Sequence, residues 1–133
     1  MCTLARETLI SIVDDDEQVR VALGRLMKAH GYLAETFGSG AGLLNSEHLA
    51  RTDCLIADVQ MPGMSGPELY GRLIAAGLPI PTILITGHPD DDVRSRALQA
   101  GVFRYLTKPV DGEDLLVCVR SALGESEGNG RGR

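Results

Sequence analysis

Long hydrophobic runs are missing from this sequence of 133 residues. No apolar stretch approaches the roughly 18 residues that a membrane-spanning helix requires. The first residues also lack the extended apolar segment of a secretory signal. We therefore expect a protein of the cytoplasm with no part embedded in a membrane.

Cysteine is scarce, with Cys2, Cys54 and Cys118 as the three representatives. Their number is odd, their spacing is wide and no Cys-x-x-Cys occurs, so neither a disulfide framework nor a zinc site is expected. Cys54 and Cys118 each lie in an apolar segment, where cysteine behaves as a small buried hydrophobe. We predict that role for both.

Positive charge is in deficit, because 13 Lys and Arg stand against 18 Asp and Glu and leave a net charge of −5. A surface that binds nucleic acid needs clustered Lys and Arg. The composition therefore argues against direct nucleic-acid binding by this domain. The acidic surplus instead leaves carboxylate clusters that could hold a cation.

The common nucleotide-binding and calcium-binding motifs are absent as well. No G-x-x-x-x-G-K-[ST] occurs, and the Gly-rich segment 38–42 has Leu43 where a dinucleotide-binding loop has its third glycine. The acidic triplet 90–92 lacks the EF-hand spacing, and we interpret it as the start of a helix. A P-loop hydrolase and a Rossmann cofactor site are therefore not expected.

What the sequence does contain is an alternation of short apolar runs with segments of helical period. The length and the hydrophobic content of 44% fit one globular domain, which we place at residues 1–123. We expect a flexible tail or the start of a linker at residues 124–133, which are Gly-rich and charged. The apolar runs are Leu9–Val13, Tyr32–Phe37, Cys54–Ala57, Thr82–Ile85 and Val102–Leu106. This (βα)5 pattern predicts a doubly wound α/β fold with a five-stranded parallel sheet.

The residues that close these strands are polar and reactive. Ligands of open α/β sheets bind beyond the carboxyl ends of the strands, so these residues should meet at one edge. The acidic triplet 14–16 follows the first strand, Asp58 the third, Thr86 the fourth and Lys108 the fifth. An isolated acidic triplet would be a helix start, and Asp16 is the expected cap. The matching ends of the other strands favour a functional site.

The charges of this site indicate a divalent cation and phosphoryl transfer. Asp14, Asp15 and Asp58 would repel one another, and Lys108 offsets only one of their charges. Hard oxygen ligands favour Mg²⁺, with Mn²⁺ able to substitute. Asp58 could then attack phosphorus and become an acyl phosphate, while the metal, Lys108 and the Thr86 hydroxyl neutralise the equatorial oxygens.

Four segments carry a family resemblance that spans roughly residues 8–123. They are 12–17 (Ile-Val-Asp-Asp-Asp-Glu), 58–66 (Asp-Val-Gln-Met-Pro-Gly-Met-Ser-Gly), 85–88 (Ile-Thr-Gly-His) and 108–109 (Lys-Pro). In this order they resemble the receiver domains of two-component response regulators. Segments 64–66 and 85–88 are similar to FixJ-like receivers in particular, which usually precede a DNA-binding helix-turn-helix domain. The resemblance implies the flavodoxin-like receiver fold with strand order 2-1-3-4-5.

The resemblance also implies a role for each residue around the phosphate. Asp58 would be the phosphoacceptor. Asp15 would bind Mg²⁺ directly, Asp14 mostly through water, and the backbone carbonyl of Gln60 would add a ligand. Lys108 would bind a phosphoryl oxygen.

A second set of implied roles concerns switching. Thr86 would move toward the phosphoryl group, and Tyr105 would rotate inward into the space left behind. Gln60 and His88 would tune the lifetime of the phosphate. The peptide bond between Lys108 and Pro109 would be cis.

Two classes of function follow from an aspartyl phosphate. The first is a signalling switch rather than a metabolic enzyme, phosphorylated by a sensor histidine kinase or phosphotransfer protein and slowly losing its phosphate by itself. Its output would pass to an effector or a second copy through the helix 93–100, the strand 102–106 and the helix 113–123. The second is a phosphohydrolase of the haloacid-dehalogenase type, which has its nucleophile in an Asp-x-Asp motif. Because Asp58 stands alone at the third strand and no cap domain fits, the sequence favours the switch.

Overall fold

The computed structural model describes residues 7–124 and contains a five-stranded sheet in the order β2-β1-β3-β4-β5. Every neighbouring pair is parallel, which confirms the predicted (βα)5 topology. The strands are β1 (Leu9–Val13), β2 (Leu33–Phe37), β3 (Cys54–Asp58), β4 (Thr82–Thr86) and β5 (Arg104–Thr107). Cys2 and the predicted tail beyond Gly124 lie outside the described residues.

The helices begin where the sequence offers side-chain caps. They are α1 (Glu17–Ala29), α2 (Gly40–Leu44), α3 (Gly66–Ala75), α4 (Asp91–Ala100) and α5 (Gly112–Ala122), with a short 3₁₀ turn η1 (Leu49–Arg51). Asp16, Asp90 and Asp111 accept hydrogen bonds from the first amides of α1, α4 and α5. Ser65 and Glu68 form a capping box at the start of α3. The triplet 90–92 is thus a helix start, as predicted.

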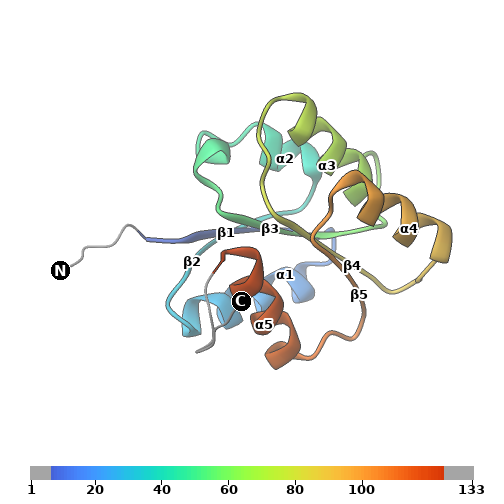
Figure 1. Ribbon diagram of the computed structural model, residues 1–133. Coiled ribbons are helices and arrows are strands. Elements are labelled where there is room, and N and C mark those ends of the chain that lie inside the picture. The colour runs from blue at the N-terminus through green and yellow to red at the C-terminus, as the bar shows by residue number, and fades with distance from the viewer. Residues whose placement is uncertain (1–6, 125–133) are drawn as a thin grey trace.

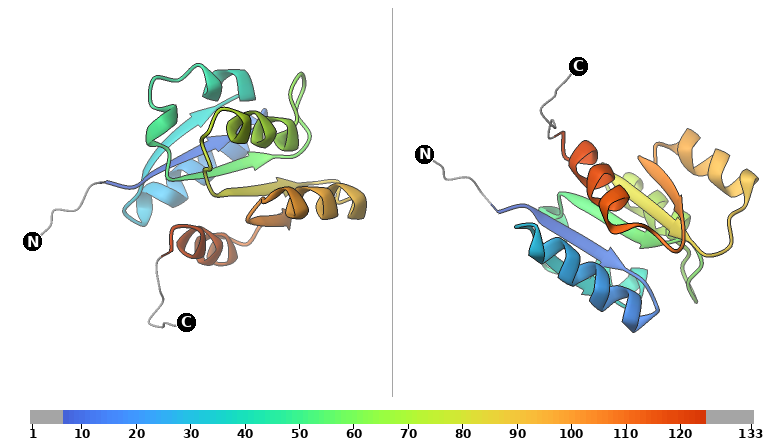
Figure 2. Two further views of the ribbon diagram at one scale, coloured as in Figure 1. Left: turned by 45° about the horizontal axis from the view of Figure 1, so that its top comes forward. Right: turned by 90° about the horizontal axis from the view of Figure 1, so that it is seen from below.

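The sheet separates two apolar cores. Figures 1 and 2 show α1 and α5 on one face and α2, α3 and α4 on the other. Ile10, Ile12 and Ile56 point to the first face, whereas Val13, Leu55 and Leu84 point to the second. The side chains of successive strand residues therefore pack into opposite cores, as expected for a parallel sheet that is covered on both sides.

The helices differ in how deeply they are anchored. Helix α3 buries four residues and α5 buries three, whereas Ala97 is the one buried residue of α4. Helix α4 ends at Gly101, which adopts a left-handed φ of 114°. Glycine tolerates this conformation without a steric penalty, so the sequence stops the helix there.

Strand β5 begins two residues later than the apolar run suggests. The amide of Val102 donates to the carbonyl of Ala97, and Val102 packs into the core beneath α4. It therefore belongs to the turn that ends α4. The other differences are small, because β3 and β4 extend one residue further and end at Asp58 and Thr86.

The two cysteines within residues 7–124 are free thiols. Cys54 is fully buried, and this burial raises the pKa of its thiol to about 12. Cys118 is half-buried and packs against the core beneath α1 and α5. Between residues 7 and 124, no helix combines the length and the apolar character that crossing a membrane would require.

Candidate functional site

Three carboxylates meet at the carboxyl edge of the sheet. Asp14 follows β1 and is 1% exposed, Asp58 ends β3 and is 5% exposed, and Asp15 is open to solvent. One carboxylate oxygen from each lies within 4.8 Å of the others. The convergence expected from the strand ends is therefore present, with one carboxylate at the mouth and two inside.

Asp14 is held by contacts to both of its carboxylate oxygens and to its backbone carbonyl. Its Oδ1 accepts from the amide of Asp16 at 2.9 Å, and its Oδ2 accepts from Nζ of Lys108 at 3.2 Å. The guanidinium of Arg20 donates to the Asp14 carbonyl at 2.8 Å. Our sequence analysis did not single out Arg20. Its position one turn into the helix that follows the acidic triplet could have indicated a contact with that triplet. These contacts fix the buried carboxylate before any ligand binds.

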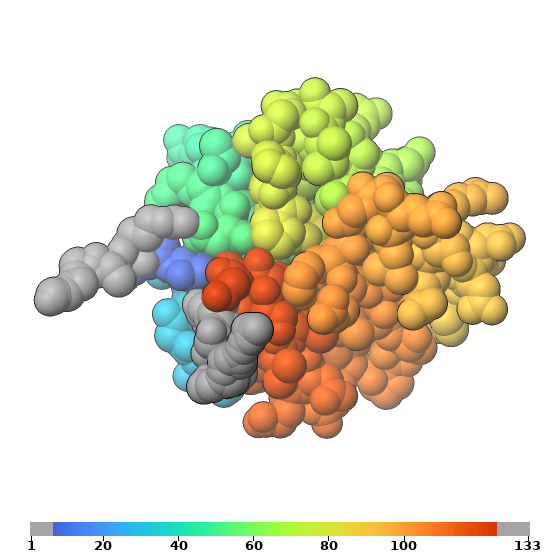
Figure 3. Space-filling model, viewed as in Figure 1, coloured from blue at the N-terminus to red at the C-terminus, as the bar shows by residue number. Residues whose placement is uncertain are grey.

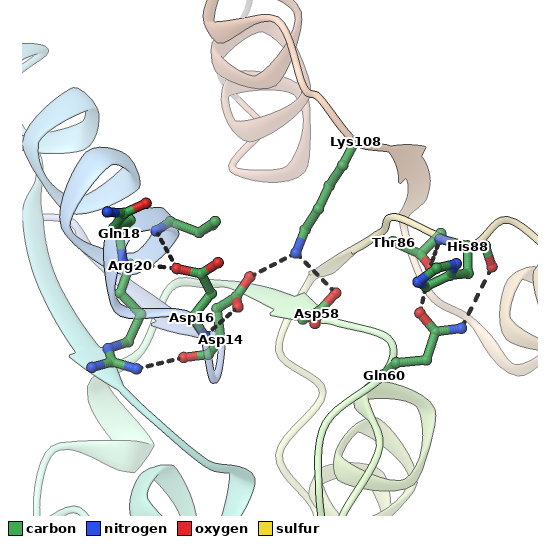
Figure 4. Close-up of polar contacts among 10 residues, drawn as sticks. Asp14, Asp16, Gln18, Arg20, Asp58, Gln60, Thr86, His88 and Lys108 are labelled. Atoms are coloured by element: carbon green, nitrogen blue, oxygen red, sulfur yellow. Dashed lines mark hydrogen bonds and ion pairs between the residues drawn. The ribbon is translucent and has the colours of Figure 1, made fainter.

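Lys108 bridges the two buried carboxylates (Figure 4). Its Nζ lies 3.2 Å from Asp14 Oδ2 and 3.3 Å from Asp58 Oδ1. Its backbone amide donates to the carbonyl of Thr86 at 2.7 Å, and the peptide bond to Pro109 is cis, as expected. Burial lowers the pKa of Lys108, but the hydrogen bond to Asp14 and the negative charges of Asp14 and Asp58 outweigh it and leave a net rise. The ammonium therefore stays charged.

Asp58 remains electrostatically unsatisfied despite this lysine. Burial and the negative charge of Asp14 raise its pKa, and Lys108 offsets only part of the effect. Asp58 Oδ1 is also the only buried side-chain polar atom among residues 7–124 without a hydrogen-bond partner. A carboxylate oxygen without a hydrogen bond, beside two further carboxylates, fits the oxygen ligands that a hard divalent cation prefers.

Gly66 lets α3 approach the end of β3. A Cβ at this position would overlap the carbonyl oxygen of Asp58 and would come within 2.9 Å of Leu84. The Gly66 amide donates to the carbonyl of Val59 at 2.9 Å. The sequence analysis contained Gly66 only as the last residue of the motif 58–66. Its steric role depends on a contact with β3, which local pattern does not reveal.

Thr86 is buried at the end of β4, and its hydroxyl is hydrogen-bonded to residues other than Asp58. It donates to Oε1 of Gln60 at 2.8 Å and accepts from the backbone amide of His88 at 2.9 Å. The Gln60 amide group donates in turn to the carbonyl of His88 at 3.4 Å. Figure 4 shows these three residues grouped to one side of Asp58. The structure thus joins Thr86, Gln60 and His88 into one cluster.

Tyr105 lies apart from the carboxylates. Its ring is half-buried against the core beneath α4. Its hydroxyl accepts from the backbone amide of Asp90, the N-cap of α4, at 3.2 Å. Tyr105 and Thr86 therefore both bind the backbone of the loop between β4 and α4.

These features define an α/β domain whose acidic pocket, bridged by a lysine, lies at the carboxyl edge of a doubly wound parallel sheet. The family model of the response regulator receiver domain matches residues 10–120, and the chain belongs to this family. It is therefore a signalling domain of two-component systems, as the motifs indicated.

Individual relatives agree with this assignment. The chain is 41% identical to the response regulator protein TmoT of Ectopseudomonas mendocina over 118 residues, which are 89% of this chain and 54% of TmoT. It is 34% identical to the transcriptional regulatory protein FixJ of Azorhizobium caulinodans, over 92% of this chain and 58% of FixJ. The chain thus spans little more than half the length of these relatives.

A solved structure titled FixJ-N superimposes with a TM-score of 0.80 at 29% identity. The match covers 90% of this chain and 96% of that one. The fold and the resemblance to FixJ-like receivers are therefore confirmed.

Proposed function

We propose that this domain is a phosphoacceptor switch in which Asp58 receives a phosphoryl group from a sensor histidine kinase or a phosphotransfer protein. The observation that carries the proposal is Asp58 Oδ1, which accepts no hydrogen bond, lies inside an acidic pocket and is 3.3 Å from the Lys108 ammonium. A carboxylate oxygen that is free of hydrogen bonds is available as a nucleophile. The bond to the donor's nitrogen breaks as the bond to this oxygen forms.

The carboxylate cluster would hold Mg²⁺, or Mn²⁺ in its place. Asp15 and Asp58 would supply side-chain oxygens, Asp14 would act mostly through water, and the backbone carbonyl of Gln60 would add a ligand. When bound, the cation supplies charge neutralisation to the transferring phosphoryl group. Lys108 would bind a second phosphoryl oxygen from its position between the two buried carboxylates.

Asp15→Asn is expected to weaken Mg²⁺ binding by roughly tenfold to a hundredfold, because it removes one charged ligand from the open side of the pocket. Calorimetric titration of the metal-free protein measures the affinity. Asp16→Asn is the matched control, because Asn caps helices as well as Asp does and the cap of α1 would survive. Equal Mg²⁺ affinity in Asp15→Asn and wild type would show that Asp15 is not a ligand.

We expect this phosphorylation to serve signalling rather than metabolism. Gln60 and His88 lie next to the pocket, where their side chains would tune the access of water to the phosphate and thus its lifetime. Receiver domains are signalling regulators, and we propose slow self-dephosphorylation without turnover of small phosphate esters. We place the domain in the cytoplasm, together with its kinase.

We propose that a partner recognises the phosphorylated state by binding to the face formed by α4, β5 and α5. Figure 3 shows the chain from α4 to α5 as one continuous side of the molecule. The partner would be an effector domain or a second copy of this chain, without direct contact between this domain and nucleic acid. The relatives' printed roles as response and transcriptional regulators support an effector outside the matched region.

The proposed relay starts with Thr86, which moves toward the phosphoryl group, and continues with Tyr105, which rotates inward. Because both residues bind the loop before α4, a shift of that loop would reach the helix directly. One charge-assisted hydrogen bond is worth about 1.5–3 kcal/mol, enough to change a population roughly tenfold to a hundredfold.

Beryllofluoride, a mimic of the phosphoryl group, is expected to shift the amide resonances of Arg96, Tyr105 and their neighbours as well as those of the pocket. The reason is that Thr86 and Tyr105 share the loop that leads into α4. Chemical-shift mapping with and without beryllofluoride in the presence of Mg²⁺ tests this. Changes confined to the surroundings of Asp58 would show that the domain does not signal through the α4–β5–α5 face.

A further inference from the structure

The hydroxyl of Thr86 already makes two hydrogen bonds in the unphosphorylated domain. Its hydrogen bond to Gln60 Oε1 is 2.8 Å long, and the His88 amide holds its oxygen from the other side at 2.9 Å. Thr86 is completely buried, so no water replaces these partners freely. Asp58 Oδ1 meanwhile accepts no hydrogen bond, although the Lys108 ammonium lies 3.3 Å away.

A hydroxyl has one proton to donate. While Thr86 donates to Gln60, it cannot donate to a phosphoryl oxygen on Asp58. The transition that the proposed function requires must therefore break the bond to Gln60. Any free energy in that bond favours the unphosphorylated arrangement, because only this arrangement contains it.

We propose that Gln60 is a positioning residue that holds Thr86 in the unphosphorylated arrangement and thereby sets how readily the pocket accepts a phosphoryl group. The inference rests on the proposed function and extends it. It differs from tuning of the phosphate lifetime, because it acts before phosphorylation and through a partner of Gln60 rather than through water.

The surroundings of Gln60 allow the bond to open without disturbing a core. Its side chain is exposed and lines a cavity of about 770 Å³ between α3 and α4, together with Met61, Pro62 and Val93. A released amide group can therefore turn into open space. The backbone carbonyl of Gln60, which we propose as a metal ligand, is a separate group and is retained in any substitution.

A purely structural role would give a different result. If the bond to Gln60 instead persists when a phosphoryl group binds, its removal leaves the Thr86 hydroxyl without this acceptor in both arrangements and lowers the stability of both alike. Binding of a phosphoryl mimic would then be unchanged. If Gln60 favours one arrangement, its removal makes the other arrangement more accessible and strengthens binding of the mimic.

The test is the affinity for beryllofluoride at saturating Mg²⁺, measured by calorimetry on wild type, Gln60→Met and Gln60→Ala. Methionine matches the length of glutamine but offers no amide oxygen. We expect about threefold to tenfold tighter binding, which corresponds to one neutral hydrogen bond. Gln99→Met, the same change on the exposed surface of α4, should bind as wild type does. The Mg²⁺ affinity of each of the four proteins is measured separately, so that all beryllofluoride affinities are compared at saturating Mg²⁺.

A double-mutant cycle separates the hydroxyl from other effects of position 60. In a Thr86→Val background there is no hydroxyl to hold, so Gln60→Met should not change the affinity further. If the wild type binds beryllofluoride but Gln60→Met and Gln60→Ala bind it no more tightly than the wild type does, the proposed role of Gln60 is overturned and the proposed function is not. Persistence of the gain in the Thr86→Val background would also overturn the role of Gln60. A wild type that binds no beryllofluoride would instead overturn the proposed function.

Discussion

Asp58→Asn is expected to abolish phosphoryl incorporation from acetyl phosphate or phosphoramidate in the presence of Mg²⁺. The wild type should gain one phosphoryl group per chain, and the variant should fall below roughly a hundredth of that level. The amide keeps the size of the carboxylate but removes the anionic oxygen that attacks phosphorus. Intact-protein mass spectrometry measures the incorporation, and peptide mapping locates it. Incubation with a small phosphate ester should show no sustained hydrolysis, unlike a dehalogenase-type phosphohydrolase.

The same variant should be well folded, so that a loss of phosphorylation cannot be attributed to unfolding. Burial and Asp14 raise the pKa of Asp58, so the folded state binds its proton more tightly than the unfolded state does. The resulting stabilisation is complete at low pH and is lost as pH rises through the folded-state pKa. Near neutral pH, Asp58→Asn should therefore raise the stability of the metal-free protein, which thermal unfolding measures.

Asp92→Asn, on the exposed first turn of α4, is the matched control and should label as the wild type does. Full labelling of Asp58→Asn at another residue would overturn the assignment of the phosphoacceptor. An unfolded Asp58→Asn protein would contradict the electrostatic account of the pocket.

Lys108→Ala is expected to slow phosphorylation by about a hundredfold to a thousandfold, the typical effect of removing one preorganised charge from a transition state. Mg²⁺ binding should not weaken, because the lysine competes with the cation for the same two carboxylates. Lys108→Arg should also be impaired, since the planar guanidinium cannot take the place of a compact ammonium between Asp14 and Asp58. Labelling rates and Mg²⁺ titrations measure the two effects separately.

Lys28→Ala provides the control for loss of a lysine, because Lys28 lies exposed in the last turn of α1. Phosphorylation of Lys108→Arg at the wild-type rate would show that position 108 supplies only positive charge. A parallel loss of Mg²⁺ binding in Lys108→Ala would show that the lysine organises the metal ligands instead.

The sequence predicted the architecture because its signals are local and agree with one another. Apolar runs of strand length, capping residues such as Asp16 and Ser65, and Gly101 at the end of α4 each report on a few neighbouring residues. The clustering of Asp14, Asp58 and Lys108 also followed, since parallel strands must end at one edge.

The contacts within the site could not be predicted in the same way. The bond from Thr86 to Gln60 depends on the rotamers of two residues that come from different strand ends. The bond from Arg20 to Asp14 and the close approach of Gly66 to Asp58 depend on how α1 and α3 dock on the sheet. Val102 was assigned to a strand because its apolar character does not distinguish a strand from the buried turn that follows a helix.

The weak anchoring of α4 has a consequence for local opening of the fold. With Ala97 as its one buried residue, α4 loses little apolar contact when it separates from the sheet, whereas α3 would expose Leu69, Tyr70 and Leu73. Segments with few buried contacts have the lowest free energies of local unfolding. The helix at the end of the proposed relay is thus the α-helix with the fewest buried residues, so it loses the least buried apolar surface when it is displaced.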